Sequence, residues 1–351
     1  MNNQVTILIN SLVQGGAEKV SLRISDIFEK NNITSNYVIV NNDIFYKTNK
    51  KIILLSNKVK VSKLEKIYLL SKYFKNKNTV ICFSLDLACY LIILRFLGKF
   101  KGKVICRFIN NPDNEVHGLT STIKRKFLFF ILKKSDFVIC QSKKMQEILT
   151  NKYCFNRQKI ITIYNPIEKN TFPEITQESD NTLNLLFVGR LTYQKNIDDI
   201  IKIALILIKK NVEFIWKIIG DGEEFIKFET LIKENNLCNH IQLLGSQKNT
   251  SLYYQWADIT TLVSHYEGMP NVLLESIAHN TPVISYNCIS GPAEIIKENI
   301  NGFLIPLYNV EKFADKLTEI EQIKKMKSND LYNSIPEFHP EIIFKEYIKI
   351  L

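Results

Sequence analysis

Short apolar runs alternate with helix-forming stretches along the chain, and this alternation constrains the fold more than any other feature of the sequence. In the first half the runs occupy residues 5–9, 37–40, 52–55, 79–83, 103–108, 137–140 and 160–164. Strands that alternate with helices form a parallel sheet, because each helix returns the chain to the starting edge of the sheet. The sequence therefore predicts an α/β fold with a doubly wound parallel sheet in this half.

The alternation stops at residues 166–182, a mostly polar stretch with two prolines that we interpret as a linker. It then restarts with runs at residues 183–188, 214–219, 241–244, 259–263, 283–286 and 302–306. A chain of 351 residues exceeds the size of one typical core. We therefore expect two Rossmann-like domains, at 1–166 and 167–337, and a terminal helix at about 338–351 that can pack back on the first.

The segment S-H-Y-E-G-M-P-N-V-L-L-E at residues 264–275 places Glu267 and Glu275 around a turn and the start of an apolar helix. Pro270 suits the first helical turn, where its missing N–H is no loss. The N–H groups at a helix start favour a phosphate, and carboxylates accept hydrogen bonds from sugar hydroxyls. A sugar joined to a phosphate meets both demands, and an ordinary buried helix with a glutamate at each end is the alternative.

Two cations and two glycines follow neighbouring strands of the predicted second sheet. Arg190 and Lys195 come after the run at 183–188, and Gly220 and Gly222 come after the run at 214–219. Arginine and lysine together suit a diphosphate, and glycines let the backbone approach a base or ribose closely. Each cation alone is better explained as an ordinary surface residue, but the order of these residues along one sheet edge favours a site for a nucleotide-linked ligand.

Gly15 and Gly16 lie between the first predicted strand and a helical stretch that runs through Ile27. A strand, a glycine turn and a helix start can form a phosphate-binding loop, although a simple tight turn has the same sequence. The dinucleotide-binding motif G-x-G-x-x-G is absent. The polar residues that follow other strands of this half are Ser84, Arg107, Asn110, Asn111 and Ser142.

The net charge of +11 is unevenly distributed. Residues 1–165 carry 28 Lys and Arg against 10 Asp and Glu, whereas residues 166–351 carry 18 against 25. The stretches 91–103 and 124–134 combine basic with bulky apolar residues, as membrane-surface helices do. Core helices with basic ends are the alternative. Nucleic acid is not an expected partner, because the sequence contains no nucleic-acid-binding module.

The seven cysteines are scattered and form no C-x-x-C motif. This arrangement favours reduced thiols in a cytoplasmic protein over a disulfide framework or a zinc site. The first ten residues have no basic lead and resemble a strand rather than a signal peptide.

The motifs G-G-A-E-K, N-P, V-G-R-L-x-x-Q-K-N, G-D-G-E, E-G-M-P-N-V-L-L-E, S-G-P-A-E-I-I and N-G-F-L-I-P follow one another along the chain. In this order they resemble glycosyltransferase family 4. Its members are retaining, metal-independent sugar-nucleotide transferases of the GT-B fold, in which two Rossmann-like domains face a cleft. The resemblance covers nearly the whole chain and is most specific in residues 183–306.

The resemblance implies that Arg190, Lys195 and Glu267 are catalytic: the cations hold the donor diphosphate, and Glu267 contacts the transferred sugar. The implied donor-binding residues are Gly15, Gly16, Gly220, Gly222, Gly268, Met269, Pro270, Asn271, Val272 and Glu275, the last accepting from the ribose. The acceptor-side candidates are Ser84, Arg107, Asn110 and Asn111. No metal and no cofactor is implied, because the UDP-sugar is a substrate.

The sequence departs from the family after the strand that ends near Arg107. Many relatives have a histidine there that can contact the donor sugar, whereas this chain has R-F-I-N-N-P-D-N-E-V-H. Asn110 or Asn111 takes that place, and His117 comes several residues later. We therefore assign no catalytic histidine.

These expectations combine into one function. The chain would transfer a hexose or N-acetylhexosamine from a UDP-sugar to a lipid-linked oligosaccharide or surface polysaccharide, such as a capsule or O-antigen. It would work as a peripheral protein at the cytoplasmic face of the cell membrane, held to anionic lipid by its basic first domain. The alternatives are another GT-B enzyme, such as a sugar-nucleotide epimerase, and a non-catalytic nucleotide-sugar-binding subunit.

Overall fold

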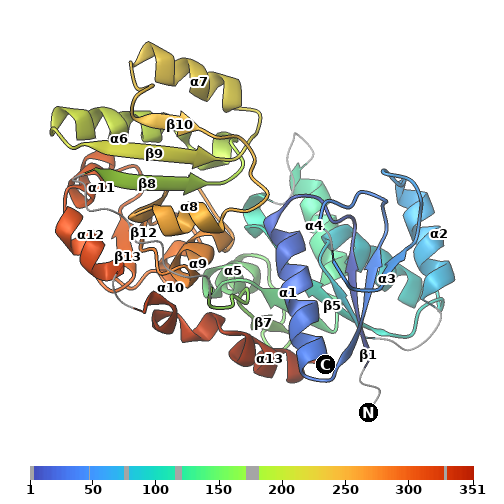
Figure 1. Ribbon diagram of the computed structural model, residues 1–351. Helices are drawn as coiled ribbons and strands as arrows, with labels where there is room; N and C mark the ends of the chain where they lie inside the picture. The colour runs from blue at the N-terminus through green and yellow to red at the C-terminus, as the bar shows by residue number, and fades with distance from the viewer. Residues whose placement is uncertain (1–3, 47, 75–78, 115–120, 171–181, 328–329) are drawn as a thin grey trace. The chain divides into compact units, whose positions relative to one another are not determined.

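The computed structural model describes residues 4–46, 48–74, 79–114, 121–170, 182–327 and 330–351. The chain forms two compact units, one made of residues 1–166 and 337–351 and the other of residues 167–336 (Figure 1). Most of the linker expected from the sequence, residues 171–181, lies outside the described residues, as does His117.

The first unit is built on a seven-stranded parallel sheet in the order β3-β2-β1-β4-β5-β6-β7. Its strands are β1 (Gln4–Ile9), β2 (Thr34–Ile39), β3 (Ile52–Leu54), β4 (Thr79–Cys82), β5 (Lys103–Arg107), β6 (Phe137–Cys140) and β7 (Ile160–Thr162). Each of them overlaps an apolar run of the sequence, so the predicted doubly wound sheet is confirmed.

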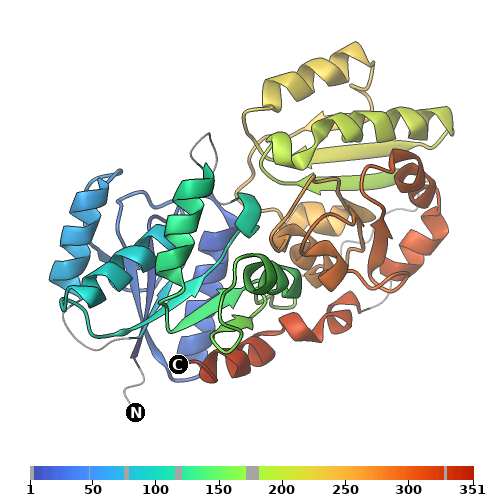
Figure 2. The ribbon, with the colours of Figure 1, turned by 180° about the vertical axis from the view of Figure 1, so that it is seen from behind.

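Helices cover both faces of this sheet. They are α1 (Gly16–Lys30), α2 (Lys63–Tyr73), α3 (Leu85–Phe96), α4 (Ser121–Leu132), α5 (Lys143–Glu147) and α13 (Pro340–Ile348). Val5, Ile7 and Ile9 of β1 point to the face covered by α1 and α13, and Leu8 points to the face covered by α2, α3 and α4. Figure 1 shows α1 in front of the sheet, and Figure 2 shows α3 and α4 on its other side.

The second unit repeats this design with a six-stranded parallel sheet in the order β10-β9-β8-β11-β12-β13. Its strands are β8 (Leu183–Val188), β9 (Phe214–Ile219), β10 (Ile241–Leu243), β11 (Ile259–Leu262), β12 (Val283–Tyr286) and β13 (Gly302–Ile305). Its helices are α6 (Ile197–Lys209), α7 (Phe225–Glu234), α8 (Ser251–Trp256), α9 (Asn271–Ala278), α10 (Pro292–Ile295), α11 (Val310–Leu317) and α12 (Ile320–Lys327).

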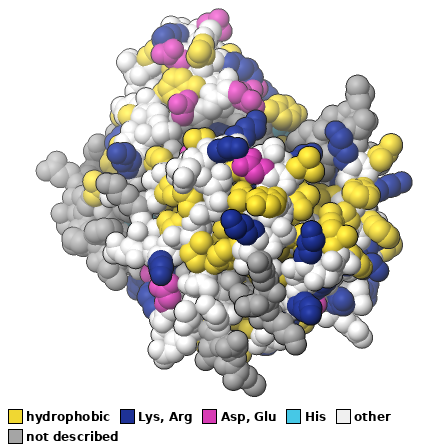
Figure 3. Space-filling view, turned by 90° about the vertical axis from the view of Figure 1, so that its right-hand side faces the viewer, with side chains coloured by type: hydrophobic (Ala, Val, Ile, Leu, Met, Phe, Trp, Pro, Cys, Tyr) yellow, Lys and Arg dark blue, Asp and Glu magenta, His cyan; other side chains and the backbone are white. Residues whose placement is uncertain are grey.

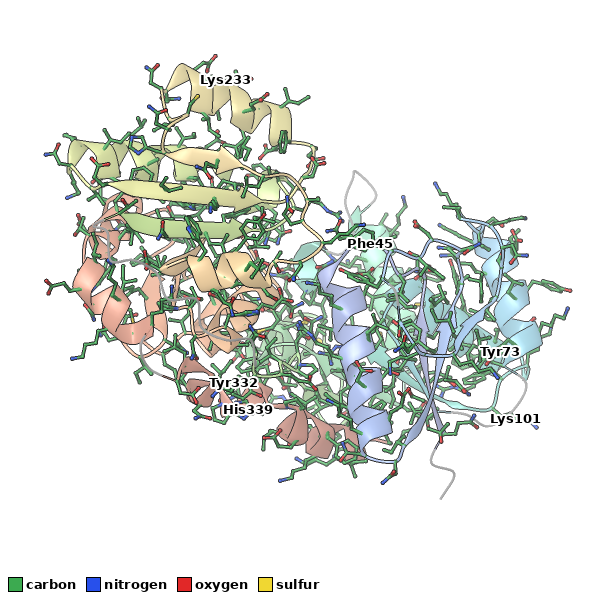
Figure 4. All side chains as sticks on the ribbon, in the orientation of Figure 1. Phe45, Tyr73, Lys101, Lys233, Tyr332 and His339 are labelled. Atoms are coloured by element: carbon green, nitrogen blue, oxygen red, sulfur yellow. The ribbon has the colours of Figure 1, made fainter. Side chains whose placement is uncertain are left out.

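Both sheets contain a point at which the chain reverses the direction in which it adds strands. In the first sheet this point lies between β1 and β4, and in the second it lies between β8 and β11. The loops that leave the two strands at such a point diverge to opposite faces, and ligands of open parallel sheets bind in the crevice between them. The carboxyl edge is therefore where a site is expected in each unit. In the first unit Phe45 lies at this edge, whereas Tyr73 and Lys101 lie toward the opposite one (Figure 4).

The C-terminal helix α13 is tied to the first unit through a buried arginine. The Arg107 guanidinium donates from Nη1 to the Tyr347 hydroxyl (3.0 Å) and from Nη2 to Asn165 Oδ1 (2.7 Å) and the Ile163 carbonyl (3.1 Å). Tyr347 packs edge-to-face on Phe28 of α1. Arg107 was expected to meet an acceptor, but its side chain is wholly buried and is used to hold the C-terminal helix.

This arrangement predicts a stability defect for Tyr347→Phe. The change leaves a buried guanidinium N–H without its acceptor, which costs about 1–3 kcal/mol. Urea unfolding followed by far-UV circular dichroism measures the loss. Both tryptophans lie in the second unit, so tryptophan fluorescence follows that unit alone.

Tyr68→Phe is the matched control, because Tyr68 is 62% exposed. We expect the control to change the free energy of unfolding by no more than about 0.5 kcal/mol. Equal effects of the two substitutions would contradict the anchoring role of Tyr347.

Candidate functional site

A buried ion pair lies at the reversal point of the second sheet. Lys195 follows β8, Glu267 follows β11, and Lys195 Nζ is 2.6 Å from Glu267 Oε1. Their side chains are 13% and 8% exposed, so both charges are largely removed from water and each depends on the other. The structure thus brings together two of the three residues that the sequence suggested as catalytic.

Hydrogen bonds between the two loops fix the position of this pair. Gln194 Nε2 donates to the Tyr266 carbonyl (2.8 Å), and the His265 N–H donates to the Gln194 carbonyl (2.9 Å). Asn196 adopts a left-handed conformation at the start of α6, and its side chain donates to the Val263 carbonyl (3.2 Å). Lys195 is therefore bracketed by two residues that are bonded to the loop carrying Glu267.

Gly220 and Gly222 are required by loop packing. Gly220 has a φ of +142°, and a Cβ at this position would collide with the Gly189 carbonyl oxygen. A Cβ at Gly222 would collide with the Leu191 carbonyl in the same way. The two glycines thus allow the loop after β9 to pack directly on the loop after β8. The sequence had suggested that they serve close approach to a ligand, and the structure shows a further, structural reason for them.

Glu275 lies on the second turn of α9, where it is buried and accepts a hydrogen bond from the Tyr254 hydroxyl (3.3 Å). The helix begins at Asn271, directly after Pro270, so Glu267 precedes the helix and Glu275 lies within it, as the sequence predicted. The loop after β12 supports this start: Ser290 Oγ donates to the Gly268 carbonyl (2.9 Å), and Gly291 lies against Pro270. Gly268, Met269, Asn271 and Val272 complete this segment.

Arg190 follows β8 directly, and its side chain is exposed. Its guanidinium makes no hydrogen bond or ion pair with another residue that the structure describes. The cation at this edge is therefore available to an anionic ligand, in contrast to Lys195.

Cys288 is a buried neighbour of the ion pair. Burial, with a contribution from the negative charge of Glu267, raises the pKa of its thiol to about 12. The thiol stays protonated at neutral pH and is a poor nucleophile.

The reversal point of the first sheet holds a pocket of about 530 Å³. Two of the predicted acceptor-side residues, Ser84 and Asn110, line it. Asn111 does not: it is buried and accepts a hydrogen bond from the Asp113 N–H (3.0 Å). Gly15 and Gly16 lie beside the pocket, at the start of α1. The Gly15 N–H donates to the Tyr46 hydroxyl (3.1 Å).

Sequence reasoning missed a network of polar side chains at this pocket, made of Asn10, Lys66 and Asp86. Asn10 Nδ2 donates to Asp86 Oδ1 (3.0 Å), and Lys66 Nζ donates to Asn10 Oδ1 (2.6 Å) and Asp86 Oδ2 (3.1 Å). Asn10 and Asp86 also line the pocket. The available signal was their position, because Asn10 directly follows β1 and Asp86 comes shortly after β4.

Helix α4 exposes a hydrophobic stripe in a basic setting. Ile123, Phe127 and Phe130 are 74%, 66% and 65% exposed, and they are spaced so that they share one side of the helix. Lys124, Lys126, Lys133 and Lys134 are also exposed.

Figure 3 shows hydrophobic side chains beside lysines and arginines on the side of the molecule that carries α2 and α3. The exposed hydrophobic residues of these two helices and the residue after α3 are Leu64, Tyr68, Phe96 and Leu97. No helix among the described residues is long and apolar enough to cross a bilayer.

Comparison with known proteins agrees with this architecture. Residues 168–335 match the family model for glycosyl transferases group 1. The chain is 26% identical over 362 residues to the amylovoran biosynthesis glycosyltransferase AmsD of Erwinia amylovora, with 99% of each chain covered. It is 24% identical over 370 residues to a Campylobacter jejuni enzyme, the GalNAc-alpha-(1->4)-GalNAc-alpha-(1->3)-diNAcBac-PP-undecaprenol alpha-1,4-N-acetyl-D-galactosaminyltransferase, covering 99% of this chain and 98% of that one.

The fold is also shared with a solved structure. HepE of Anabaena, in complex with UDP and glucose, superposes with a TM-score of 0.80 at 16% identity, and 98% of each chain is covered. With two doubly wound parallel sheets, the expected GT-B fold is confirmed. The chain is thus a glycosyltransferase of the GT-B fold, and residues 168–335, in its second unit, match the family model for glycosyl transferases group 1.

Proposed function

We propose that the chain is a retaining, metal-independent transferase of glycosyltransferase family 4. It moves a hexose or N-acetylhexosamine from a UDP-sugar to a lipid-linked oligosaccharide or a surface polysaccharide, such as a capsule or O-antigen. The observation that carries this proposal is the buried Lys195–Glu267 pair at the reversal point of the second sheet. UDP and glucose bound to HepE, and the undecaprenol-linked acceptor named for the Campylobacter enzyme, support the choice of donor and acceptor class.

The cations of the site suit the leaving group of the reaction. Negative charge builds on the donor diphosphate as its bond to the sugar breaks, and preorganised cations stabilise that charge. Lys195 is held in place by Glu267, and the exposed Arg190 can close on the diphosphate from the solvent side. These two positive charges perform the task that a divalent cation performs in metal-dependent transferases.

The two glutamates grip the donor at different points. Glu267 has a second carboxylate oxygen beyond the one that binds Lys195, and it accepts from a hydroxyl of the transferred sugar. Glu275, buried beside Tyr254, accepts from the ribose hydroxyls. The start of α9, with its N–H groups, faces the phosphate or sugar between them.

The reaction then needs no protein nucleophile. The bond between the sugar C1 and the phosphate oxygen breaks, and the bond to the acceptor oxygen forms on the same face of the sugar. The acceptor hydroxyl gives its proton to the departing phosphate oxygen. The protonated thiol of Cys288 takes no part, and the two glutamates are donor-binding groups rather than an acid/base pair.

A lipid-linked acceptor requires access to a membrane surface, and α4 supplies a means of reaching it. Its exposed Ile123, Phe127 and Phe130 insert among lipids, while the neighbouring lysines bind anionic head groups. The protein thus works as a peripheral protein at the cytoplasmic face of the membrane. Because Leu128 of the same helix lines the first-unit pocket, the pocket lies close to this surface.

Replacing Lys195 by alanine tests the catalytic assignment. Loss of one preorganised charge at the leaving group lowers kcat/KM by about 10²–10³-fold. Mass spectrometry of a panel of UDP- and GDP-sugars with purified acceptor glycolipids measures the turnover. Lys227→Ala is the matched control, because Lys227 forms an exposed ion pair of 2.8 Å with Asp198 in the same unit. Undiminished turnover by Lys195→Ala would refute the assignment, and conversion of a donor without any acceptor would indicate an epimerase.

Replacing Phe127 and Phe130 together by serine tests the membrane surface. We expect the wild-type protein to sediment with phosphatidylglycerol vesicles at low salt. It should be released as salt rises, because salt screens the attraction between the lysines and the anionic lipid. The double variant loses most of this binding, whereas Ile226→Ser, an exposed change on α7, leaves it intact. Equal binding by all three proteins would show that α4 is not the contact.

A further inference from the structure

The pocket of the first unit is a built site that does not include the Lys195–Glu267 pair of the second unit. It lies at the carboxyl ends of β1, β4 and β5, around the reversal point of the first sheet. Its apolar walls come from Ile9, Phe83, Leu85, Ile109 and Leu128. Its volume of about 530 Å³ falls within the range of about 300–1,000 Å³ that is usual for small-molecule pockets.

The polar side of the pocket is organised before any ligand arrives. Lys66 is 13% exposed and donates to both Asn10 and Asp86, so it fixes the position of the Asp86 carboxylate. Each oxygen of that carboxylate accepts one hydrogen bond, from Asn10 or from Lys66. A carboxylate oxygen accepts about two, so each oxygen retains room for one more donor. Asp86 is 39% exposed and therefore reachable.

The charges of the pocket select against an anion. Asp86 and Glu18 both line it, and the one lysine of the network is already paired with Asp86. A carboxylate or phosphate placed there would meet two like charges with no unpaired cation from the network, which is unfavourable. Hydroxyl groups above apolar ring faces suit the same surroundings, because they donate to the carboxylates while the C–H faces contact Phe83 and Leu128.

We propose that this pocket binds an uncharged sugar residue of the acceptor, with Asp86 as the hydroxyl-binding residue and Lys66 as its positioning residue. The pocket rejects residues that carry a carboxylate or phosphate, so anionic groups of the acceptor lie outside it. This inference rests on the proposed glycosyltransferase function and names the substrate class of its acceptor site. Asp86 also lies in the first turn of α3, where a carboxylate stabilises a helix, and the test must separate the two roles.

Saturation-transfer NMR on the full chain, with methyl glycosides as probes, makes the test. The neutral probes are methyl glucoside, methyl galactoside and their N-acetylamino counterparts, and the anionic probes are methyl glucuronide and methyl galacturonide. We expect at least one neutral glycoside to bind more than tenfold better than its uronic-acid counterpart. Asp86→Asn should weaken that neutral glycoside about ten- to a hundredfold, because a hydrogen bond to a charged group is lost.

Glu65→Gln is the matched control. Glu65 lies on α2, as Lys66 does, but it pairs with Lys58 and does not line the pocket. Lys66→Met should raise the acceptor KM and leave UDP-sugar binding, followed by thermal shift, unchanged. If Asp86 only stabilises the helix, Asp86→Asn lowers the melting temperature without changing glycoside affinity.

Three results would overturn the inference while UDP-sugar still binds. They are equal binding of neutral and anionic glycosides, unchanged affinity in Asp86→Asn, and no binding of any neutral glycoside at millimolar concentration. Loss of UDP-sugar binding and turnover in the wild-type protein would instead refute the proposed function itself.

Discussion

The proposed donor site of this protein depends on one interaction, the ion pair between Lys195 and Glu267. Neither charge is stable in such a buried position alone, and removing one partner of a buried pair costs about 3–5 kcal/mol. The pair therefore ties the loop after β8 to the loop after β11, and the hydrogen bonds of Gln194 and Asn196 strengthen the same link. The loops that leave β8 and β11 diverge at the reversal point of the sheet and leave a crevice between them, which explains why the site is there.

The two units use the same topology for different chemistry. In the second unit the reversal point carries a buried lysine, an exposed arginine and two glutamates, a set that suits a phosphate joined to a sugar. In the first unit the corresponding point carries an acidic pocket whose lysine is already paired. The basic charge of the first unit lies instead on exposed surfaces such as α4. In the proposed function, the fold thus separates a site for a charged donor from a site for neutral hydroxyl groups.

Much of this could be predicted from sequence, for reasons that particular residues make plain. The strands are buried on both faces, so runs such as 183–188 and 214–219 stand out and their ends locate the sheet edge. Lys195 and Glu267 could be named because their types and positions at strand ends suit the chemistry. The Asn10–Lys66–Asp86 network could not, since its members are far apart in sequence and meet only in the folded unit. Arg107 ends a strand, yet it turns inward to Tyr347, a contact that no local pattern shows.

The account is tested most directly by a double-mutant cycle on donor affinity. Lys195→Ala, Glu267→Gln and the double variant would be titrated calorimetrically with UDP and with the UDP-sugar that binds best. We predict that Lys195→Ala weakens both ligands, that Glu267→Gln weakens the UDP-sugar much more than UDP, and that the two changes are not additive, because the side chains are in contact. Equal effects of Glu267→Gln on UDP and UDP-sugar, or strict additivity, would contradict the claim that the pair grips the phosphate and the sugar of one donor.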